Sequence, residues 1–125
     1  MRILLDTHVV LWTLAGADRI QAIQPILQSP HNDIYVSVAS WWEIAIKIGI
    51  GKLNADLQHL RQASEESGMI ELPVKGEHSE ALLTLPPIHK DPFDRILVAQ
   101  AMTEPMKLMT ADNQLDNYSE LVWKI

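Results

Sequence analysis

Short runs of branched apolar residues alternate along this chain with longer segments in which apolar residues recur at helical spacing. The short runs predict strands at 2–6, 33–38, 69–73, 107–112 and 121–125. The segments between them predict helices at 7–16, 19–28, 40–51, 55–67, 78–85 and 89–101. Strands that alternate with helices indicate an α/β fold, in which a parallel sheet is covered by helices on both faces.

Glycine and proline mark where several of these helices should end. Gly16 closes the first helix, and Gly68 ends the helix over 55–67. Pro25 should kink or interrupt the helix predicted at 19–28, because proline lacks the amide hydrogen that a helix interior needs. Pro86 and Pro87 stop the helix over 78–85.

The composition is that of a globular protein. The chain has 125 residues, of which 47% are hydrophobic and 21% are charged, so we expect one domain spanning 1–125 with one core. It contains no cysteine, which excludes disulfides, thiolate zinc sites and cysteine nucleophiles. Asp6 and His8 interrupt the apolar N-terminal run, so it does not read as a signal peptide, and no segment is long enough to span a bilayer. We therefore expect a soluble, cytoplasmic protein.

The formal net charge of −6 bears on the choice of substrate. A protein that binds nucleic acid usually has a basic surface. Two explanations stay open for this acidic chain. Either nucleic acid is not the substrate, or carboxylates gathered at a metal site account for part of the excess, and metal ions restore local attraction for phosphate.

Four acidic residues lie close to predicted strand ends. Asp6 closes the first strand, Asp112 follows the strand that begins at Lys107, and Asp94 lies at the start of the helix before that strand. Glu43 lies in the helix that follows the second strand. Ligands of such folds bind at the carboxyl ends of the strands. Four carboxylates converging there would repel one another without a cation, and a set of oxygen ligands suits Mg²⁺ or Mn²⁺.

Simpler structural roles are available for the same residues. Glu43 and Lys47 are four residues apart, which suits an ion pair at a surface edge of the helix. Asp91 precedes Pro92 and fits an N-cap. Asp94 then falls at the third helical position, where Glu or Gln would complete a capping box, and Asp has a shorter reach for that role. Capping explains Asp91 well and explains Asp94 less well.

Four segments together resemble the PIN-domain nucleases and, more narrowly, the VapC-type toxins of toxin–antitoxin pairs: LLDTHVVLW at 4–12, SVASWWEIAIKIGIGKL at 37–53, HKDPFDRILVAQA at 89–101 and LMTADNQL at 108–115. The resemblance implies a three-layer α/β/α sandwich and an endoribonuclease that depends on Mg²⁺ or Mn²⁺. It makes Asp6, Glu43 and Asp94 the main metal ligands and Asp112 a fourth, variable one. It also places the hydroxyl groups of Thr7, Ser40 and Thr110 near these acids.

The resemblance further implies an RNA substrate, a cognate antitoxin whose tail lies over the acidic groove, and a homodimer. His8, Lys47 and Arg95 are candidates for contacts with phosphate.

Two other functions compete with that of a metal-dependent ribonuclease. One is a receiver-like signalling module with an acidic Mg²⁺ pocket, and the other is an inactive PIN-like domain that only binds a partner.

Two other classes of hydrolase are excluded by absent motifs. The chain lacks the H-E-x-x-H pattern of zinc hydrolases and the G-x-S-x-G pattern of esterases.

Overall fold

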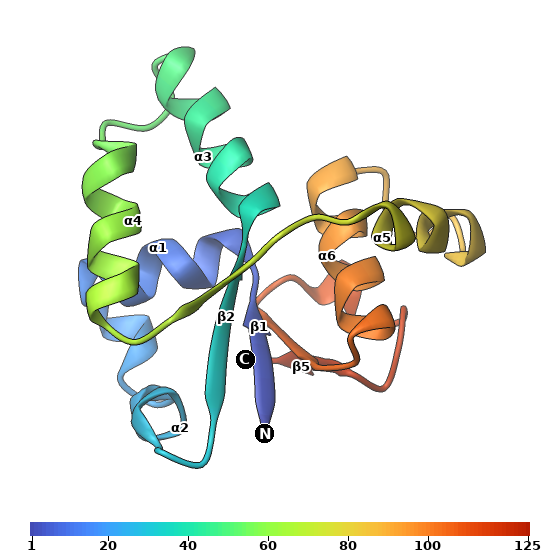
Figure 1. The fold of residues 1–125 in the computed structure, drawn as a ribbon, viewed down its shortest axis with the longest axis horizontal. Coiled ribbons are helices and arrows are strands. Elements are labelled where there is room, and N and C mark those ends of the chain that lie inside the picture. The colour runs from blue at the N-terminus through green and yellow to red at the C-terminus, as the bar shows by residue number, and fades with distance from the viewer.

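The computed structural model describes residues 1–125, and its elements follow the predicted alternation of strands and helices (Figure 1). The strands are β1 (Arg2–Leu5), β2 (Asp33–Ser37), β3 (Ile70–Leu72), β4 (Lys107–Thr110) and β5 (Val122–Lys124). The α-helices are α1 (Thr7–Ala15), α2 (Gln24–Gln28), α3 (Val38–Gly49), α4 (Leu57–Glu66), α5 (Gly76–Ala81) and α6 (Pro92–Thr103). Three short 3₁₀ helices complete the chain: η1 (Asp18–Ile20), η2 (Leu82–Thr84) and η3 (Asn113–Leu115).

The five strands form one sheet in the order β3-β2-β1-β4-β5, and every neighbouring pair is parallel. From β1 the chain first builds outward through β2 to β3, and it then returns to the other side of β1 to add β4 and β5. The strand order therefore reverses between β1 and β4. In open parallel sheets this is the place where ligands bind, at the carboxyl ends of the strands.

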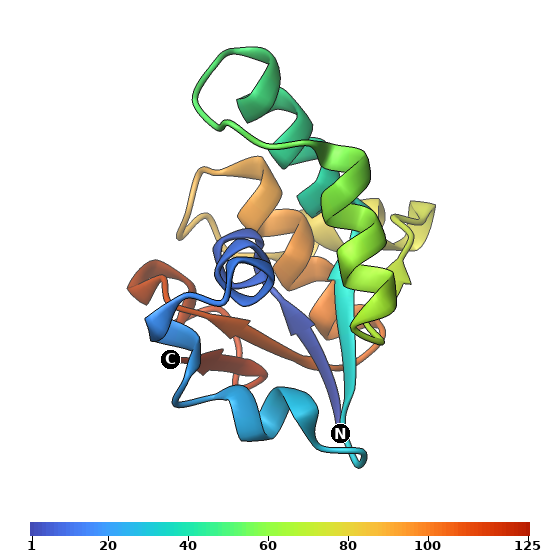
Figure 2. The same cartoon turned by 90° about the vertical axis from the view of Figure 1, so that its left-hand side faces the viewer.

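Helices cover both faces of the sheet, as the sequence predicts, and the side chains of each strand alternate between two cores. Ile3, Leu5 and Met109 point to a core that also holds residues of α1, α3 and α4. Leu4 and Leu108 point to the opposite core, which α6 and the segment around η3 complete. Figures 1 and 2 show these layers, with α1, α2 and α4 on one side of the sheet and α5 and α6 on the other. The predicted α/β/α sandwich is confirmed.

Local sequence signals set several helix ends. Asp6 caps the start of α1 by accepting a hydrogen bond from the Val9 amide, and Gly16 ends that helix in the left-handed conformation at φ 65°. Ser37 caps α3 through the Ala39 amide. Each cap lies where a strand ends, so the side chains that terminate the strands also begin the helices.

The structure differs from the predictions in the details of some elements. The single helix predicted at 19–28 is divided into η1 and α2, and Pro25 lies in the first turn of α2, where its missing amide hydrogen costs nothing. Strand β1 ends at Leu5 and β4 ends at Thr110, because Asp6 and Asp112 cap the helices that follow. Helix α5 begins two residues earlier than predicted, at Gly76.

None of the helices combines the length and the apolar composition that a membrane-spanning segment requires.

Candidate metal site at the carboxyl ends of β1 and β4

Asp6 and Asp112 flank the position where the strand order reverses. The Asp6 amide donates a hydrogen bond to the Met109 carbonyl over 3.0 Å, which continues the β1–β4 ladder by one residue. The Thr110 hydroxyl donates to Oδ2 of Asp6 and also accepts from the Asp112 amide, at 3.0 Å. One threonine at the end of β4 therefore links both acids, and it holds the Asp6 carboxylate in place.

Asp94 joins these acids from the first turn of α6, together with a histidine. The His89 Nε2 atom lies 2.7 Å from Oδ2 of Asp94 and 3.6 Å from Oδ2 of Asp112. One ligand atom from each of these three side chains lies within 4.8 Å of the other two. The structure thus brings together two of the four predicted acids, one from the segment after β4 and one from α6, around one imidazole ring.

Asp94 is ionised less readily than an ordinary aspartate. Burial, together with the negative charges of Asp91 and Asp6, raises the pKa of the Asp94 carboxyl to about 6, although the contact with His89 opposes the shift. Because the charge of Asp6 contributes to this rise, Asp6 lies within electrostatic range of Asp94. A carboxyl whose pKa is raised in this way is one that an added cation would stabilise in its ionised form.

Asp6 is more deeply buried and shows a shift in the same direction. Burial raises the pKa of its carboxyl, while the hydrogen bonds from Thr110 and from the Val9 amide work against the rise. Its side chain is 3% exposed. Hydrogen bonds hold both oxygens of Asp6, yet no cationic side chain forms a salt bridge with it.

Glu43 lies outside the group formed by His89, Asp94 and Asp112. It is 8% exposed in the middle of α3, and its Oε2 atom forms the predicted ion pair with Lys47 at 3.1 Å. Its Oε1 atom is buried without any hydrogen-bond partner. The pair predicted for a surface edge therefore exists, but the carboxylate is buried and only half of it is satisfied.

The position of Glu43 on its helix relates it to Asp6. Ser40 lies one turn before Glu43 on the same face of α3, and its hydroxyl accepts a hydrogen bond from Thr7, the residue after Asp6, at 2.9 Å. Both hydroxyl groups are buried. This bond ties the start of α1 to the first turns of α3, so the face of α3 that carries Glu43 is held beside the segment that carries Asp6.

Asp91 has the structural role that the sequence predicts. Its Oδ1 atom accepts hydrogen bonds from the Phe93 amide at 2.8 Å and from the Asp94 amide at 3.1 Å, so it caps α6. Asp94, by contrast, makes no capping bond back to the Asp91 amide, and its carboxylate points to His89. The capping-box explanation of Asp94 is therefore wrong.

Arg95 has a structural role in place of a contact with phosphate. Its guanidinium donates hydrogen bonds to the carbonyls of Leu82, Pro86 and His89 and to the Tyr118 hydroxyl, over 3.2–3.4 Å. The Tyr118 hydroxyl also accepts a bond from the His89 amide at 2.8 Å. Arg95 and Tyr118 together fix the loop that presents His89 to Asp94.

His89 is the member of the site that sequence reasoning missed. The only available signal was its place in HKDPFD, five residues before Asp94. No helical or strand period relates these two residues, because His89 lies in the loop before α6. Of the other candidates for phosphate contacts, Lys47 pairs with Glu43, and His8 is exposed in the first turn of α1.

The donor atoms of this region fit a hard divalent ion. Asp6, Asp94 and Asp112 supply carboxylate oxygens at one end of the sheet, and Glu43 has a buried oxygen with no partner. A buried carboxylate oxygen without a partner is costly in a folded protein, and a cation would satisfy it. His89 orients this set of oxygens, since its Nε2 atom lies 2.7 Å from Oδ2 of Asp94.

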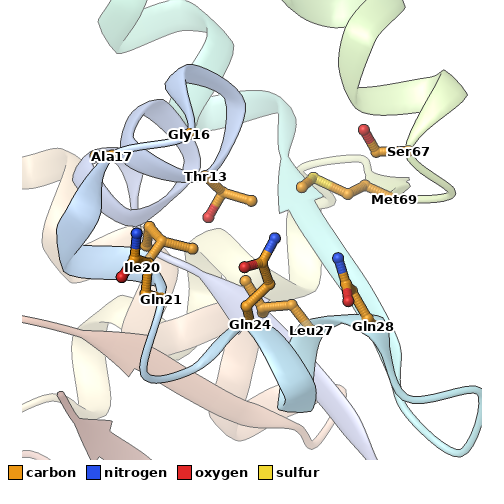
Figure 3. Close-up of a pocket in the computed structure, with 10 residues that line it drawn as sticks. All are labelled: Thr13, Gly16, Ala17, Ile20, Gln21, Gln24, Leu27, Gln28, Ser67 and Met69. Carbon is orange, nitrogen blue, oxygen red and sulfur yellow. The ribbon is translucent and has the colours of Figure 1, made fainter.

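The larger surface cavities are not lined by Asp6, Glu43, Asp94 or Asp112. Figure 3 shows a cavity of about 420 Å³ at the far end of α1, lined by Thr13, Gln21, Gln24, Gln28, Ser67 and Met69, among others. None of the residues that line it is acidic, basic or histidine. The cavity therefore offers hydrogen bonds but no acid–base or metal chemistry, which concentrates at the strand ends.

Comparison with solved structures supports the same fold. A chain of VapBC2 from Rickettsia felis, bound to a DNA fragment from its promoter, superposes with a TM-score of 0.74 at 14% identity, over 99% of this chain and 98% of that one. A toxin–antitoxin complex from Klebsiella pneumoniae gives a TM-score of 0.65 at 21% identity, over 98% and 99% of the two chains. FitAcB from Neisseria gonorrhoeae gives 0.60 at 16% identity, over 90% and 88%. No curated protein sequence matches this chain significantly.

The family model of the PIN domain matches residues 3–121, which includes every strand of the sheet except the last and all four predicted acids. PIN domains are generally nucleases, and divalent metals are typical of them. By this match, the chain belongs to the PIN-domain family.

Proposed function

We propose that residues 1–125 form a single nuclease domain that hydrolyses RNA with the help of Mg²⁺ or Mn²⁺, and that it is the toxin of a toxin–antitoxin pair. The observation that carries the proposal is the gathering of Asp6, Asp94 and Asp112 at the reversal of the strand order, with the pKa of Asp94 raised to about 6. Such a group of acids is costly in the protein alone and is what a divalent cation would stabilise.

We propose Asp6, Glu43, Asp94 and Asp112 as the residues that hold the metal. A divalent ion bound there supplies positive charge that lowers the pKa of a water molecule and neutralises the phosphate oxygens. The protein's part is to keep its carboxylates in fixed orientations. Thr110 holds Asp6 through Oδ2, and His89 holds Asp94 through Oδ2, which leaves Oδ1 of Asp94 without a side-chain partner.

His89 acts in this proposal as a positioning residue for Asp94. The loop that carries it is fixed by Arg95 and Tyr118, so the imidazole does not depend on substrate for its place. Hydrogen bonds that orient the ligands of a metal commonly decide its affinity. Removing the imidazole should therefore weaken metal binding without removing any proposed carboxylate ligand.

The choice of RNA and the toxin role rest on likeness. Two of the solved structures that this chain resembles are VapBC2 from Rickettsia felis and a toxin–antitoxin complex from Klebsiella pneumoniae, and both align over nearly the full length of both chains. We therefore propose an antitoxin as the protein partner, and a second copy of the chain as a further partner. Apolar surface is exposed along α3 at Val38, Ile46 and Ile50, and a protein partner could cover it.

The direct test is cleavage of a panel of structured RNAs by the purified chain, with Mg²⁺ or Mn²⁺ and with EDTA. We expect discrete cleavage products that disappear with EDTA and in the Asp94→Asn variant. A single-stranded DNA of matching sequence tests the choice of RNA. If the wild-type chain leaves every RNA intact in both metals, or cleaves equally in EDTA, the proposed function is wrong.

A further inference from the structure

We propose that the exposed side of α1 carries a binding platform for single-stranded RNA, made of His8, Trp12 and Arg19, which leads the substrate away from the acidic end of the sheet. The proposal rests on the proposed function, since it names how the strand is held beside that site. We call these three residues the α1 ridge.

The three side chains of the α1 ridge lie next to one another on the surface. His8 and Trp12 are four residues apart on α1, with ring centroids 5.9 Å apart and planes tilted by 38°. The guanidinium carbon of Arg19, which follows the end of the helix, lies 3.9 Å from the centroid of the Trp12 ring. An imidazole, an indole and a guanidinium thus form one continuous row of flat, electron-rich or cationic groups.

Arg19 has no internal ionic role that would explain its place. Its side chain is exposed, and it forms neither a salt bridge nor a hydrogen bond with any residue of the chain; its recorded contact is the indole. The other arginines differ: Arg2 and Arg61 pair with Glu104 and Glu71, and Arg95 binds carbonyl groups. In a chain with a net charge of −6, an unpaired cation that lies over an aromatic ring is available to a ligand.

Trp12 is held between the core and the exposed side chain of Arg19. The indole is half-buried and packs against the core that contains Val9 and Val10. Figure 2 shows α1 end-on at the front of the molecule, with no other helix in front of it. Aromatic rings fixed in this way, and guanidinium planes stacked on them, are surfaces on which the bases of single-stranded nucleic acid stack.

The α1 ridge begins at the proposed metal site. His8 follows Asp6 by two residues and lies in the first turn of α1, the helix that Asp6 caps. Helix α1 spans nine residues, so the ridge extends roughly 13 Å from the site at 1.5 Å per residue. A strand whose phosphate lies at the acids would therefore have its neighbouring bases over the ridge.

Other aromatic side chains of the surface lack this combination. Trp42 is 64% exposed on α3, but it meets Phe93 edge-on with centroids 5.2 Å apart, and no cation lies over it. Trp42 and the paired Arg61 therefore serve as matched controls, because each presents the same chemical group without the stack.

The test measures RNA binding separately from cleavage. Fluorescein-labelled short oligoadenylate is titrated with the Asp94→Asn protein, and its anisotropy is followed. Trp12→Leu and Arg19→Gln in that background should each weaken binding about tenfold, within the roughly 1–3 kcal/mol that stacking contributes per base. Trp42→Leu and Arg61→Gln should leave the affinity unchanged. Arg19→Gln is the safer variant for folding, because Arg19 is exposed and forms no salt bridge or hydrogen bond within the chain.

An abasic strand of the same length separates stacking from charge. The effect of Trp12→Leu should vanish on the abasic strand, since a sugar–phosphate chain has no base to stack. Equal losses on both strands, or unchanged affinity in both ridge variants, would overturn the proposal. If the ridge variants bind RNA normally but no longer co-elute with a coexpressed antitoxin, the ridge is a protein interface and the proposal is wrong.

The two proposals can fail separately. If the wild-type chain cleaves no RNA while the ridge variants still lose affinity for oligoadenylate, the nuclease proposal is wrong and the platform stands. If the wild-type chain cleaves RNA and the ridge variants bind it as the parent does, the platform is wrong and the nuclease proposal stands.

Discussion

Two histidine–carboxylate pairs lie at opposite ends of β1, and they differ in how completely they are neutralised. At the carboxyl end, His89 lies 2.7 Å from Asp94, with Asp112 beside it. At the amino end, His78 lies 2.6 Å from Glu104. Each histidine has donor atoms of two carboxylates within 4.8 Å, so the two groups are equal candidates for a metal site by residue type and distance alone.

The pair at the amino end is satisfied within the protein. His78 is fully buried, and its Nδ1 atom accepts a hydrogen bond from the Lys75 amide at 2.9 Å, so its Nε2–H donates to Glu104. Arg2 pairs with the same glutamate at 3.4 Å. The hydrogen bond from His78 lowers the pKa of Glu104, so this carboxylate is already stabilised in its charged form.

The pair at the carboxyl end is left with excess negative charge. Burial and neighbouring acids raise the pKa of Asp94 and of Asp6, and no arginine or lysine reaches either of them. The comparison teaches that two similar contacts can have opposite meanings. A histidine–carboxylate pair whose partners are all internal stabilises the fold, whereas an added cation would stabilise a pair with unbalanced negative charge.

The largest expected effect that tests this contrast is on catalysis. Asp94→Asn should lower RNA cleavage by about 1,000-fold or more, equivalent to about 4 kcal/mol of lost transition-state stabilisation. Glu104→Ala should leave cleavage per folded molecule close to wild type, because Glu104 lies at the other end of β1. Initial rates on the same RNA, normalised to the folded fraction from circular dichroism, provide the measurement. Equal losses in both variants would remove the functional difference between the two ends.

Stabilisation by metal should also distinguish the group at the carboxyl end of β1 from the group at its amino end. Saturating Mn²⁺ or Mg²⁺, at about 100 times its Kd, should raise the free energy of unfolding by about 2.7 kcal/mol, seen as a higher melting temperature than in EDTA. Asp94→Asn and Glu43→Gln should lose most of this gain. Glu104→Ala should keep it. A gain that disappears in Glu104→Ala but persists in Asp94→Asn would place the metal at the amino end.

Loss of the contact between His78 and Glu104 should destabilise the fold directly. Glu104→Ala leaves the buried Nε2–H of His78 without an acceptor and removes the partner of Arg2. We expect the free energy of unfolding to fall by about 1.5–3 kcal/mol, the usual range for a hydrogen bond to a charged group. Urea denaturation without metal measures the change. Glu104→Gln is the milder control, since its carbonyl oxygen can still accept the bond from His78.

The metal-free protein should respond to Asp94→Asn in the opposite direction. The pKa of Asp94 is about 6 in the folded protein and 3.8 as its ordinary value, so the folded state binds more protons between these pH values. Its stability therefore falls as pH rises from about 4 to 6, and the full cost is present above pH 6. We expect the variant to be about 1–2 kcal/mol more stable than wild type at pH 8, after allowance for solvent screening, and to lose this advantage at pH 4.

Urea denaturation in EDTA at both pH values tests this crossover. A variant that is clearly less stable than wild type at pH 8 would show that Asp94 supports the fold, as Glu104 does.

The smallest effect concerns Asp91, which both caps α6 and adds negative charge near Asp94. Asp91→Ala should cost about 1 kcal/mol, since it removes the two capping bonds. Asp91→Asn keeps an oxygen for the cap and removes the charge, so it should change stability little while lowering the pKa of Asp94 toward its ordinary value. NMR titration of the Asp94 carboxyl measures that pKa. No change in Asp91→Asn would contradict the assigned cause of the shift.

The sequence predicted the fold well because its signals are local. Short apolar runs predict the five strands, and helical spacing predicts the helices between them. The alternation of strands and helices predicts the parallel sheet, and the family match confirms the sandwich. The role of Asp91 also followed from its neighbours, because an N-cap and a proline at the next position act within one turn. Asp6 and Asp112 were placed at one end of the sheet by strand direction alone.

What the sequence by itself determined is thus the period of each segment, the ends of its helices and the end of the sheet at which acids gather. Only the tertiary structure decided which charged groups have a partner. It places His89 in contact with Asp94 and directs Arg95 to backbone carbonyls. It also leaves one oxygen of Glu43 without a hydrogen-bond partner and places Arg19 over Trp12. The physical reason is that secondary structure follows from the spacing of apolar residues within a short segment. The neutralisation of a charge depends instead on distances between helices and strands, which only their packing sets.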